Sequence, residues 1–385
     1  AEYKTRDSDV ASERNVLTQH PSQKYMKRLF FLLILPLLST GCLRDELPNA
    51  EADILTCTLA EASLLKREPI IENDKITLFV EANADLTRQT LSFTLSDGAV
   101  IEPAGGTTRN FSTPQTYTVT SQDGQWKKTY TVAFVADELP TRYHFEDTVA
   151  EKNGRFCIFA EKQNGRVSME WASGNLGFAM TGNAQTPDDY PAAQSANGYT
   201  GQCARLTTRS TGSFGALAGM PIAAGNLFIG TFDLLSALST PLKATRFGLP
   251  FYRRPLYLSG YYKYKAGTTY YQNGQPAQTA ITDRCHFYAV LYETDKTLKT
   301  LDGTNILTHP NVICTAVVEN QKETDEWTHF RLPFITRKGK TIDATKLRNG
   351  IYNLAVVFTS SIAGATFSGA PGSTLYIDEV EIVCE

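Results

Sequence analysis

The sequence predicts an all-β protein with two β-sandwich domains, a small one followed by a larger one. Short runs of alternating apolar and polar residues recur along the chain and are separated by Gly and Asn turns, which is the pattern of half-buried strands. No long amphipathic helix pattern occurs. The chain has 385 residues, of which 42% are hydrophobic, so it is long enough for two separate cores.

The beginning of the chain is expected to lie outside both domains. Residues 1–25 carry no apolar periodicity and do not begin with methionine, and we interpret them as an upstream extension that is not native. Residues 29–38 are apolar and follow Lys27 and Arg28. At helical rise this run spans about 15 Å, half of the roughly 30 Å hydrocarbon core of a bilayer. The positive flank, the short apolar run and the small residues after it predict a signal peptide over residues 26–41.

The exit from this run, "STGC" ending at Cys42, resembles the cleavage site of lipoprotein signal peptides. In that family the cysteine becomes the lipidated first residue of the mature chain. The family prefers leucine three places before the cysteine, whereas Leu38 stands four places before it. Asp45 and Glu46 resemble the export signal of surface-exposed lipoproteins of some Gram-negative bacteria. We therefore expect a lipid on Cys42, a tether over residues 42–52 and a surface-exposed outer-membrane location, with ordinary secretion as the alternative.

The charge and the cysteine spacing argue against a nucleic-acid-binding site and a zinc site. The chain has 37 basic and 40 acidic residues, a formal net charge of −3 and no basic block, which argues against a nucleic-acid partner. The six cysteines after Cys42 are too far apart for a zinc-type pair. Several lie in apolar alternation, as in "RFCIFA" and "NVICTAV". Buried free thiols are expected there, and one disulfide remains possible in an exported protein.

Residues 53–137 are predicted to form the smaller domain. The stretch "QTYTVTSQDGQWKKTYTVAFV" places Tyr117 and Val119 on one strand face, and Asp123-Gly124 lies between two alternating runs, which is a strong hairpin signal. The segment resembles the immunoglobulin-like modules that follow the lipid anchor in surface glycan-handling lipoproteins. That resemblance implies a spacer.

Residues 138–385 are predicted to form the larger domain, after the polar boundary "ADELPTRY". The runs "RCHFYAVLYE", "GIYNLAVVFTSS" and "STLYIDEVEIV" read as strands, and residues 341–348 allow one short helix. About 245 residues of short strands suit one large β-sandwich or jelly roll. The apolar alternation of the last run changes phase at Asp378 and Glu379, which predicts a β-bulge or a site that requires acids.

Five stretches of the larger domain resemble the "putative carbohydrate metabolism domain" family, PCMD. They are "WASGNLGF", "PIAAGNLFIGTF", "RFGLPFYRRPLYLSGYYKYKAG", "DEWTHFRLPF" and "SSIAGATFSGAPGSTLYIDEVEIV". They occur in the order of the family and cover most of the domain. The resemblance implies a jelly-roll fold and a setting among surface proteins that capture and break down glycans; it implies a context and not a reaction.

Non-catalytic glycan binding is the function that we favour from the sequence. Aromatic rings can stack on the apolar faces of sugars, while polar side chains hold the hydroxyl groups. Residues 180–201 look like a long loop without secondary structure, and such loops are often functional. The expected glycan-binding residues are in or near this loop or in a second group: Trp171, Tyr190, Tyr199, Asp188 and Asp189 in the first, and Tyr252, Arg253 and Arg254 in the second. The expected partners are a polysaccharide or oligosaccharide and other glycan-uptake proteins.

Two alternative functions and one metal site remain open from the sequence. A glycoside hydrolase needs two facing carboxylates about 5 to 9.5 Å apart, and no spacing selects such a pair. A structural or adhesive surface protein would bind another protein through an exposed apolar patch. A structural calcium ion, held by Glu146 and Asp378 where the first and last strands of the larger domain meet, would suit hard oxygen ligands; otherwise these acids would bond to loop amides or water.

Overall fold

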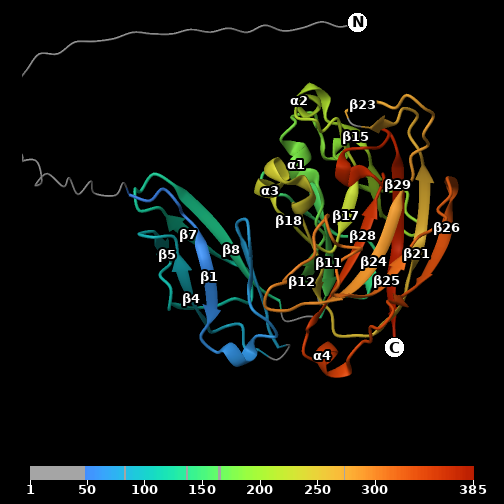
Figure 1. Cartoon of the computed structure of the whole chain (residues 1–385). Helices are drawn as coiled ribbons and strands as arrows, with labels where there is room; N and C mark the ends of the chain where they lie inside the picture. The colour runs from blue at the N-terminus through green and yellow to red at the C-terminus, as the bar shows by residue number, and fades with distance from the viewer. Residues whose placement is uncertain (1–47, 82–83, 136–137, 164–165, 273) are drawn as a thin grey trace, which may run out of the picture. The chain divides into compact units, whose positions relative to one another are not determined.

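The computed structural model describes residues 48–81, 84–135, 138–163, 166–272 and 274–385 (Figure 1). The predicted signal peptide and the predicted lipidation site at Cys42 lie outside the described residues. Strands dominate both domains, so the predicted all-β fold class is confirmed. No described helix is long and apolar enough to cross a bilayer.

The smaller domain consists of two sheets around one apolar core. One sheet has the order β1 (Ile54–Leu59), β4 (Gln89–Leu95) and β6 (Thr108–Arg109). The other has the order β2 (Ile70–Glu72), β3 (Lys75–Phe79), β8 (Lys127–Val135), β7 (Gln115–Thr120) and β5 (Val100–Glu102). The predicted hairpin is β7 and β8, in which Tyr117 faces Tyr130. Gly124 takes a positive φ of 71° in its turn, a conformation that glycine adopts without steric cost.

The larger domain is built on two six-stranded sheets that pack face to face. The first, called the β21 sheet, has the order β13 (Ala192–Ser195), β14 (Cys203–Thr207), β29 (Thr374–Cys384), β21 (Pro255–Lys265) and β26 (Thr324–Pro333), and β9 (Arg142–Tyr143) pairs with β29. The second, called the β28 sheet, has the order β17 (Asn226–Phe228), β28 (Tyr352–Thr359), β24 (His286–Glu293), β25 (Val312–Val317) and β27 (Ile335–Thr336), and β20 (Leu249–Pro250) pairs with β28. The long strands alternate between the two sheets along the chain, as in a jelly roll.

The two sheets differ in how many of their faces are covered. Residues of β28 and β24 are buried almost without interruption, because apolar clusters cover both faces of this sheet. In β21 every second side chain is buried, including Leu258, Tyr262 and Tyr264. The β21 sheet therefore buries one face in the core and leaves Tyr257, Tyr261 and the other alternate side chains on its outer face.

The predicted change of phase in the last strand is a β-bulge. Between the pairs Ser259–Glu381 and Tyr261–Asp378, β29 has one residue more than β21. Glu379 takes the extra position with a positive φ of 47°. The bulge keeps Leu375, Ile377, Val380 and Ile382 buried on the core side, and it also turns the Asp378 carboxylate away from solvent.

Shorter elements surround the sandwich. The additional strands are β10 (Thr148–Ala150), β11 (Cys157–Gln163), β12 (Arg166–Glu170), β15 (Arg209–Ser210), β16 (Ile222–Ala223), β18 (Gly230–Phe232), β19 (Thr245–Phe247), β22 (Tyr271–Gln272) and β23 (Gln275–Pro276). The helices are α1 (Asn175–Ala179), α2 (Gly212–Leu217), α3 (Leu234–Ser239), α4 (Ala344–Arg348) and the 3₁₀ turns η1 (Ala62–Leu64), η2 (Pro187–Asp189), η3 (Pro241–Lys243) and η4 (Gly364–Thr366). The predicted helix over residues 341–348 is α4, which begins after its N-cap Asp343.

Two further expectations concern the loop and the thiols. The segment 180–201 is not a structureless loop, because it contains η2 and β13, and β13 pairs with β14. All six cysteines of the described chain are free thiols, four of them buried, as the apolar alternation predicted.

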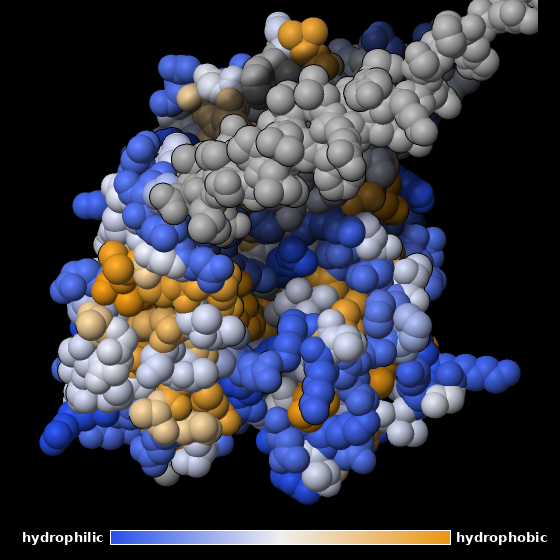
Figure 2. All heavy atoms as spheres, turned by 60° about the vertical axis from the view of Figure 1, so that its left-hand side comes forward, coloured by the Kyte–Doolittle hydropathy of each residue, from blue (hydrophilic) through white to orange (hydrophobic). Residues whose placement is uncertain are grey.

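Figure 2 shows apolar patches between polar side chains on the face that it presents. Large exposed apolar residues include Leu217 on α2 and Leu235 and Leu238 on α3.

Candidate functional site

The outer face of the β21 sheet carries a row of aromatic and cationic side chains across four strands. Arg205 on β14 pairs with Tyr376 on β29, and Tyr376 pairs with Lys263 on β21. Trp327 on the neighbouring β26 continues the row, since the Lys263 ammonium lies 4.7 Å from its ring centroid. At about 4.8 Å between strands, the row is roughly 14 Å long.

A second group of rings lies beside this row. The rings of Tyr199 and Tyr261 are stacked, with centroids 3.7 Å apart and planes 9° apart. The Tyr199 ring also meets Trp327 edge-on at 6.4 Å, and His329 lies 5.1 Å from Tyr261. We call Tyr199, Tyr261, Trp327 and Tyr376 the aromatic platform.

Polar groups surround the aromatic platform. The Lys263 ammonium also lies 5.2 Å from the Tyr376 ring centroid, so it is held between two rings by cation–π attraction. His329 shares a hydrogen bond of 3.0 Å with the Ser259 hydroxyl. His144 and Glu379 form a pair at 2.9 Å. Exposed rings with donors and acceptors at their edges can bind a ligand that has both apolar faces and hydroxyl groups.

Two acids, the buried Asp378 and the exposed Glu146, fix the loop that carries Tyr199. The Asp378 carboxylate accepts a hydrogen bond from the Thr200 amide at 3.0 Å, and the Glu146 carboxylate accepts one from the Gln202 amide at 3.0 Å. Burial raises the pKa of Asp378 to about 6. The chain thus places Tyr199 on Tyr261 through contacts between segments that are far apart in sequence.

This arrangement gives the predicted calcium ligands a hydrogen-bonding role. Glu146 and Asp378 both bind amides of residues 200–202, which is the alternative to a metal site that the sequence left open. Among the described residues, no group of three or more His, Cys, Asp or Glu side chains could hold a metal ion. A calcium ion at these two acids stays a prediction.

Burial corrects the expectation for two of the predicted glycan-binding rings. Trp171 is 2% exposed and Tyr190 is 4% exposed. Trp171 packs against Tyr143 and Phe145 at 5.1 and 5.4 Å, so its ring belongs to the core and no sugar can stack on it. Tyr190 packs against Phe156 at 4.9 Å.

The indole N–H of Trp171 has a structural partner. It donates a hydrogen bond of 3.1 Å to Glu161. Burial raises the pKa of this carboxyl to about 7.

Tyr199 is the predicted ring that reaches the surface, with 49% of its side chain exposed. The two predicted acids near it differ in role. Asp188 pairs with Arg205 at 3.4 Å and therefore lies at the edge of the aromatic row. Asp189 accepts the Thr186 amide at 2.8 Å and closes the first turn of η2.

The second predicted group is not brought to the aromatic platform. Tyr252, Arg253 and Arg254 precede β21, whereas Tyr261 and Lys263 lie near its other end. Arg253 pairs with Glu138 at 3.3 Å, and Arg254 lies 3.7 Å from Glu385. The hydroxyl of Tyr252 is buried and has no hydrogen-bond partner among the residues that the structure describes.

Sequence reasoning missed Tyr261, Lys263, Trp327 and Tyr376 as site residues. The signal that could have found some of them is the alternation of β21 from Leu258 to Tyr264, in which Tyr261 and Lys263 share one face. The stretch "YYKY" places aromatic residues on both faces, so the alternation alone did not say which face is the core.

Comparison with known families agrees with the two-domain β-sandwich fold. The model of the family described as "Putative carbohydrate metabolism domain" (PCMD) matches residues 144–383. The family model described as "SGBP, N-terminal" matches residues 55–133, consistent with an immunoglobulin-like module. The chain belongs to the PCMD family, and it carries a module of the second family before the PCMD domain. Both domains are of carbohydrate-related families.

Two solved structures are similar to this chain over nearly all of their own length. A crystal structure from Bacteroides thetaiotaomicron VPI-5482 is 54% identical, with a TM-score of 0.80, and the alignment covers 89% of this chain and 99% of that chain. Another, from Bacteroides vulgatus ATCC 8482, is 47% identical, with a TM-score of 0.61, and covers 64% and 99%. Each is described as a "putative glycoside hydrolase". No curated protein matches the chain.

Proposed function

We propose that this protein binds a glycan without cleaving it, as a lipid-anchored outer-membrane protein within a polysaccharide capture and utilisation system. The aromatic platform is the observation that carries this proposal. Its rings lie on the solvent side of a rigid sheet, with Lys263 and His329 beside them. Such a surface is preformed, so little conformational entropy is lost when a sugar chain binds.

The surroundings of the platform favour binding over catalysis. The acids nearest to the stacked tyrosines already have structural partners. Asp378 is fully buried and accepts the Thr200 amide. Glu379 is paired with His144. A retaining or inverting glycosidase needs two carboxyl groups that face one another across the sugar. Asp378 and Glu379 are instead engaged in structural contacts.

Glycoside hydrolysis is the second candidate function. The description of both solved relatives as glycoside hydrolases favours it. Glu161 and Asp378 are carboxyls whose pKa burial raises to about 7 and about 6, and a raised pKa is typical of a general acid. Both carboxyls are, however, screened from solvent by the residues around them.

One paired experiment separates the two functions. The purified protein is run through native gels that contain plant, host or microbial polysaccharides, and the same polysaccharides are assayed for released reducing sugar. We expect retardation in at least one gel, loss of that retardation in Tyr261→Ala, and no released sugar. Release of reducing sugar would overturn the proposal in favour of hydrolysis. Mobility unchanged by every polysaccharide would move the proposal to binding of another protein.

A further inference from the structure

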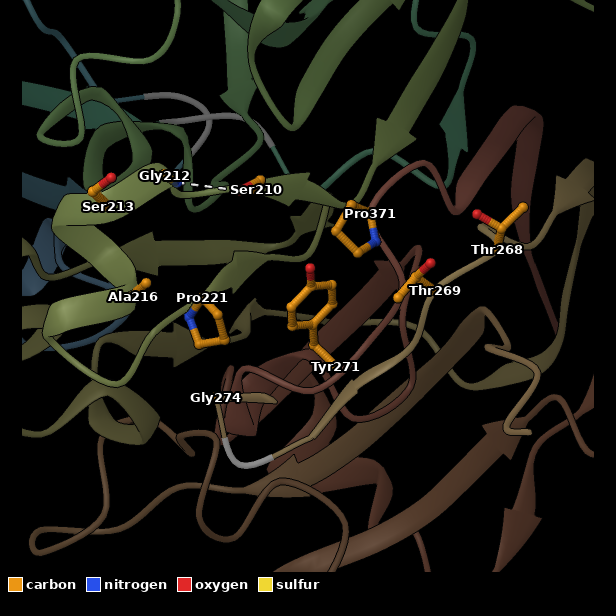
Figure 3. A pocket seen from close by; sticks show the side chains of 10 residues that line it. All are labelled: Ser210, Gly212, Ser213, Ala216, Pro221, Thr268, Thr269, Tyr271, Gly274 and Pro371. Atoms are coloured by element: carbon orange, nitrogen blue, oxygen red, sulfur yellow. Dashed lines mark hydrogen bonds between the residues drawn. The ribbon is translucent and has the colours of Figure 1, made fainter. Parts of the chain in front are cut away.

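A cavity lies at one end of the larger domain, and no ring of the aromatic platform is among its described lining residues. It has a volume of about 570 Å³, within the range of ~300–1,000 Å³ that is usual for ligand pockets. Its walls come from β15, α2 and Pro221 on one side and from Thr268, Thr269, Tyr271 and Pro371 on the other (Figure 3). We call it the Tyr271 pocket.

The lining of the Tyr271 pocket is neutral and rich in hydroxyl groups. Ser213, Thr268 and Thr269 contribute hydroxyls, and Tyr271 contributes a ring between Pro221 and Pro371 (Figure 3). None of the described residues that line the pocket is Lys, Arg, Asp or Glu. A ligand that carries a charge would lose its hydration here without gaining an ion pair. The lining suits an uncharged ligand that has several hydroxyls and an apolar face.

A buried hydrogen-bond network holds the wall that contains Pro371. The Asp283 carboxylate, 1% exposed, accepts the Ser373 hydroxyl at 2.7 Å and the Ala370 amide at 2.8 Å. The Ser373 hydroxyl oxygen in turn accepts the Gly267 amide at 3.0 Å. Because these contacts fix both sides of Pro371, the wall is set before any ligand arrives.

The segment with Tyr271 is fixed against the same wall. The Tyr271 amide donates to the Gly369 carbonyl at 2.8 Å, and the Gly369 amide donates to the Tyr271 carbonyl at 3.0 Å. The two bonds form an antiparallel bridge. The backbone of Tyr271, from which its ring extends, is therefore held in place by two hydrogen bonds.

The pocket and the platform are connected by the same two strands. β21 carries Tyr261 and Lys263 and ends at Lys265, shortly before Thr268. β29 carries Tyr376 and begins just after Pro371. At about 3.3 Å per residue, Lys263 and Thr268 are at most ~17 Å apart along the chain, so one short oligosaccharide can span from one site toward the other.

We propose that the Tyr271 pocket binds one uncharged sugar unit, an end or a branch, of the glycan that the platform captures. This inference rests on the proposed function, because it assigns part of the same ligand to a second site. The platform tolerates many sugars, since every pyranose has an apolar face. The neutral pocket then selects among them and disfavours uronic acids and sulfated sugars.

The test uses small neutral probes that a single pocket can hold. Saturation-transfer NMR is recorded on the purified protein with maltose, cellobiose, gentiobiose, lactose, mannobiose and xylobiose, and with digalacturonate as the anionic probe. We expect transfer to at least one neutral disaccharide and severalfold weaker transfer in Tyr271→Ala. Tyr270→Ala, which changes the adjacent tyrosine outside the pocket lining, is the matched control. Melting curves of every variant show whether it is folded.

The outcomes separate the pocket from the platform. Transfer that survives in folded Tyr271→Ala but disappears in Trp327→Ala would overturn the pocket and leave the platform as the binding site. Loss in Tyr271→Ala with unchanged polysaccharide retardation in Tyr261→Ala would support the pocket and overturn the platform. Transfer to digalacturonate that depends on Tyr271, or no transfer to any neutral disaccharide, would overturn the pocket proposal.

Discussion

The three tryptophans of the chain lie in three different environments, and each predicts a different result on truncation. Trp327 is half-buried in the aromatic platform, Trp171 is 2% exposed in the core and Trp126 is 63% exposed in the hairpin of the smaller domain. We expect Trp327→Ala to weaken glycan binding about tenfold, because one stacked ring contributes on the order of 1.5 kcal/mol. Its free energy of unfolding should fall by less than about 1 kcal/mol.

For the core residue Trp171, we expect a large effect on stability and none on glycan binding. Trp171→Ala should lower the free energy of unfolding by about 3–5 kcal/mol, because it removes a buried aromatic ring and leaves a cavity. Trp126→Ala should change neither property. Chemical denaturation and affinity electrophoresis on the three variants measure both. Weaker binding by a well-folded Trp171→Ala variant would contradict this assignment of roles.

Glu161 predicts a pH dependence of stability. The folded state raises the pKa of this carboxyl from 4.5 to about 7 through burial. Between these two values the folded chain keeps a proton that the unfolded chain has released. Stability contributed by this group is therefore lost as the pH rises from 4.5, and the loss is complete above about pH 7.

The variant Glu161→Gln isolates this effect, because glutamine cannot ionise. We expect the variant and the parent protein to have similar free energies of unfolding at pH 5. At pH 8 the variant should be more stable by up to about 3 kcal/mol. Denaturation at both pH values measures this difference, with the exposed Glu326→Gln as the control. Equal pH dependence of the parent protein and Glu161→Gln would argue that the carboxyl is not held in a buried environment.

At the scale of elements, the loop over residues 198–202 links the β-bulge to the platform. A Cβ atom on Gly198 would lie 2.7 Å from the backbone carbonyl oxygens of three residues of this loop, closer than real Cβ contacts allow. Gly198→Ala should therefore shift the loop and move Tyr199 off Tyr261. We expect severalfold weaker glycan binding in affinity electrophoresis, with the core unchanged.

The matched control is Gly105→Ala in the smaller domain. A Cβ atom there meets its nearest neighbour at 3.6 Å, which is ordinary van der Waals contact. This variant should bind glycan as the parent protein does. If Gly198→Ala also bound normally, the stacked position of Tyr199 would not be needed for binding.

The same elements show which features the sequence could predict. The hairpin of β7 and β8 and the bulge at Glu379 follow from residues that are close together in the sequence, so a period of two and a turn signal suffice for them. The environments of Trp171 and Tyr199 depend on partners that are far apart in the sequence. Tyr143 and Phe145 bury the first ring, and Asp378 holds the loop of the second. No local pattern contains these contacts.

At the scale of the whole molecule, the domains are carbohydrate-related, and their place in the cell is our proposal. It rests on the residues before the first domain, "RLFFLLILPLLSTGCLRDE". A lipid on Cys42 would hold the chain at a membrane, because one acyl chain contributes about 0.8 kcal/mol per buried CH₂ group and several chains make the attachment stable. The acids Asp45 and Glu46 would then direct the lipoprotein to the outer face.

Two substitutions test these steps separately in a Gram-negative host that exports lipoproteins to its surface. Cys42→Ala should abolish labelling by an alkyne-tagged fatty acid and move the protein out of the membrane fraction, while Cys157→Ala, which changes a free thiol of the larger domain, should leave both unchanged. The double variant Asp45→Ala/Glu46→Ala should stay lipidated but become protected from protease added to intact cells. Continued labelling of Cys42→Ala would show that the anchor lies elsewhere. A double variant that stays accessible to protease would show that surface export uses another signal.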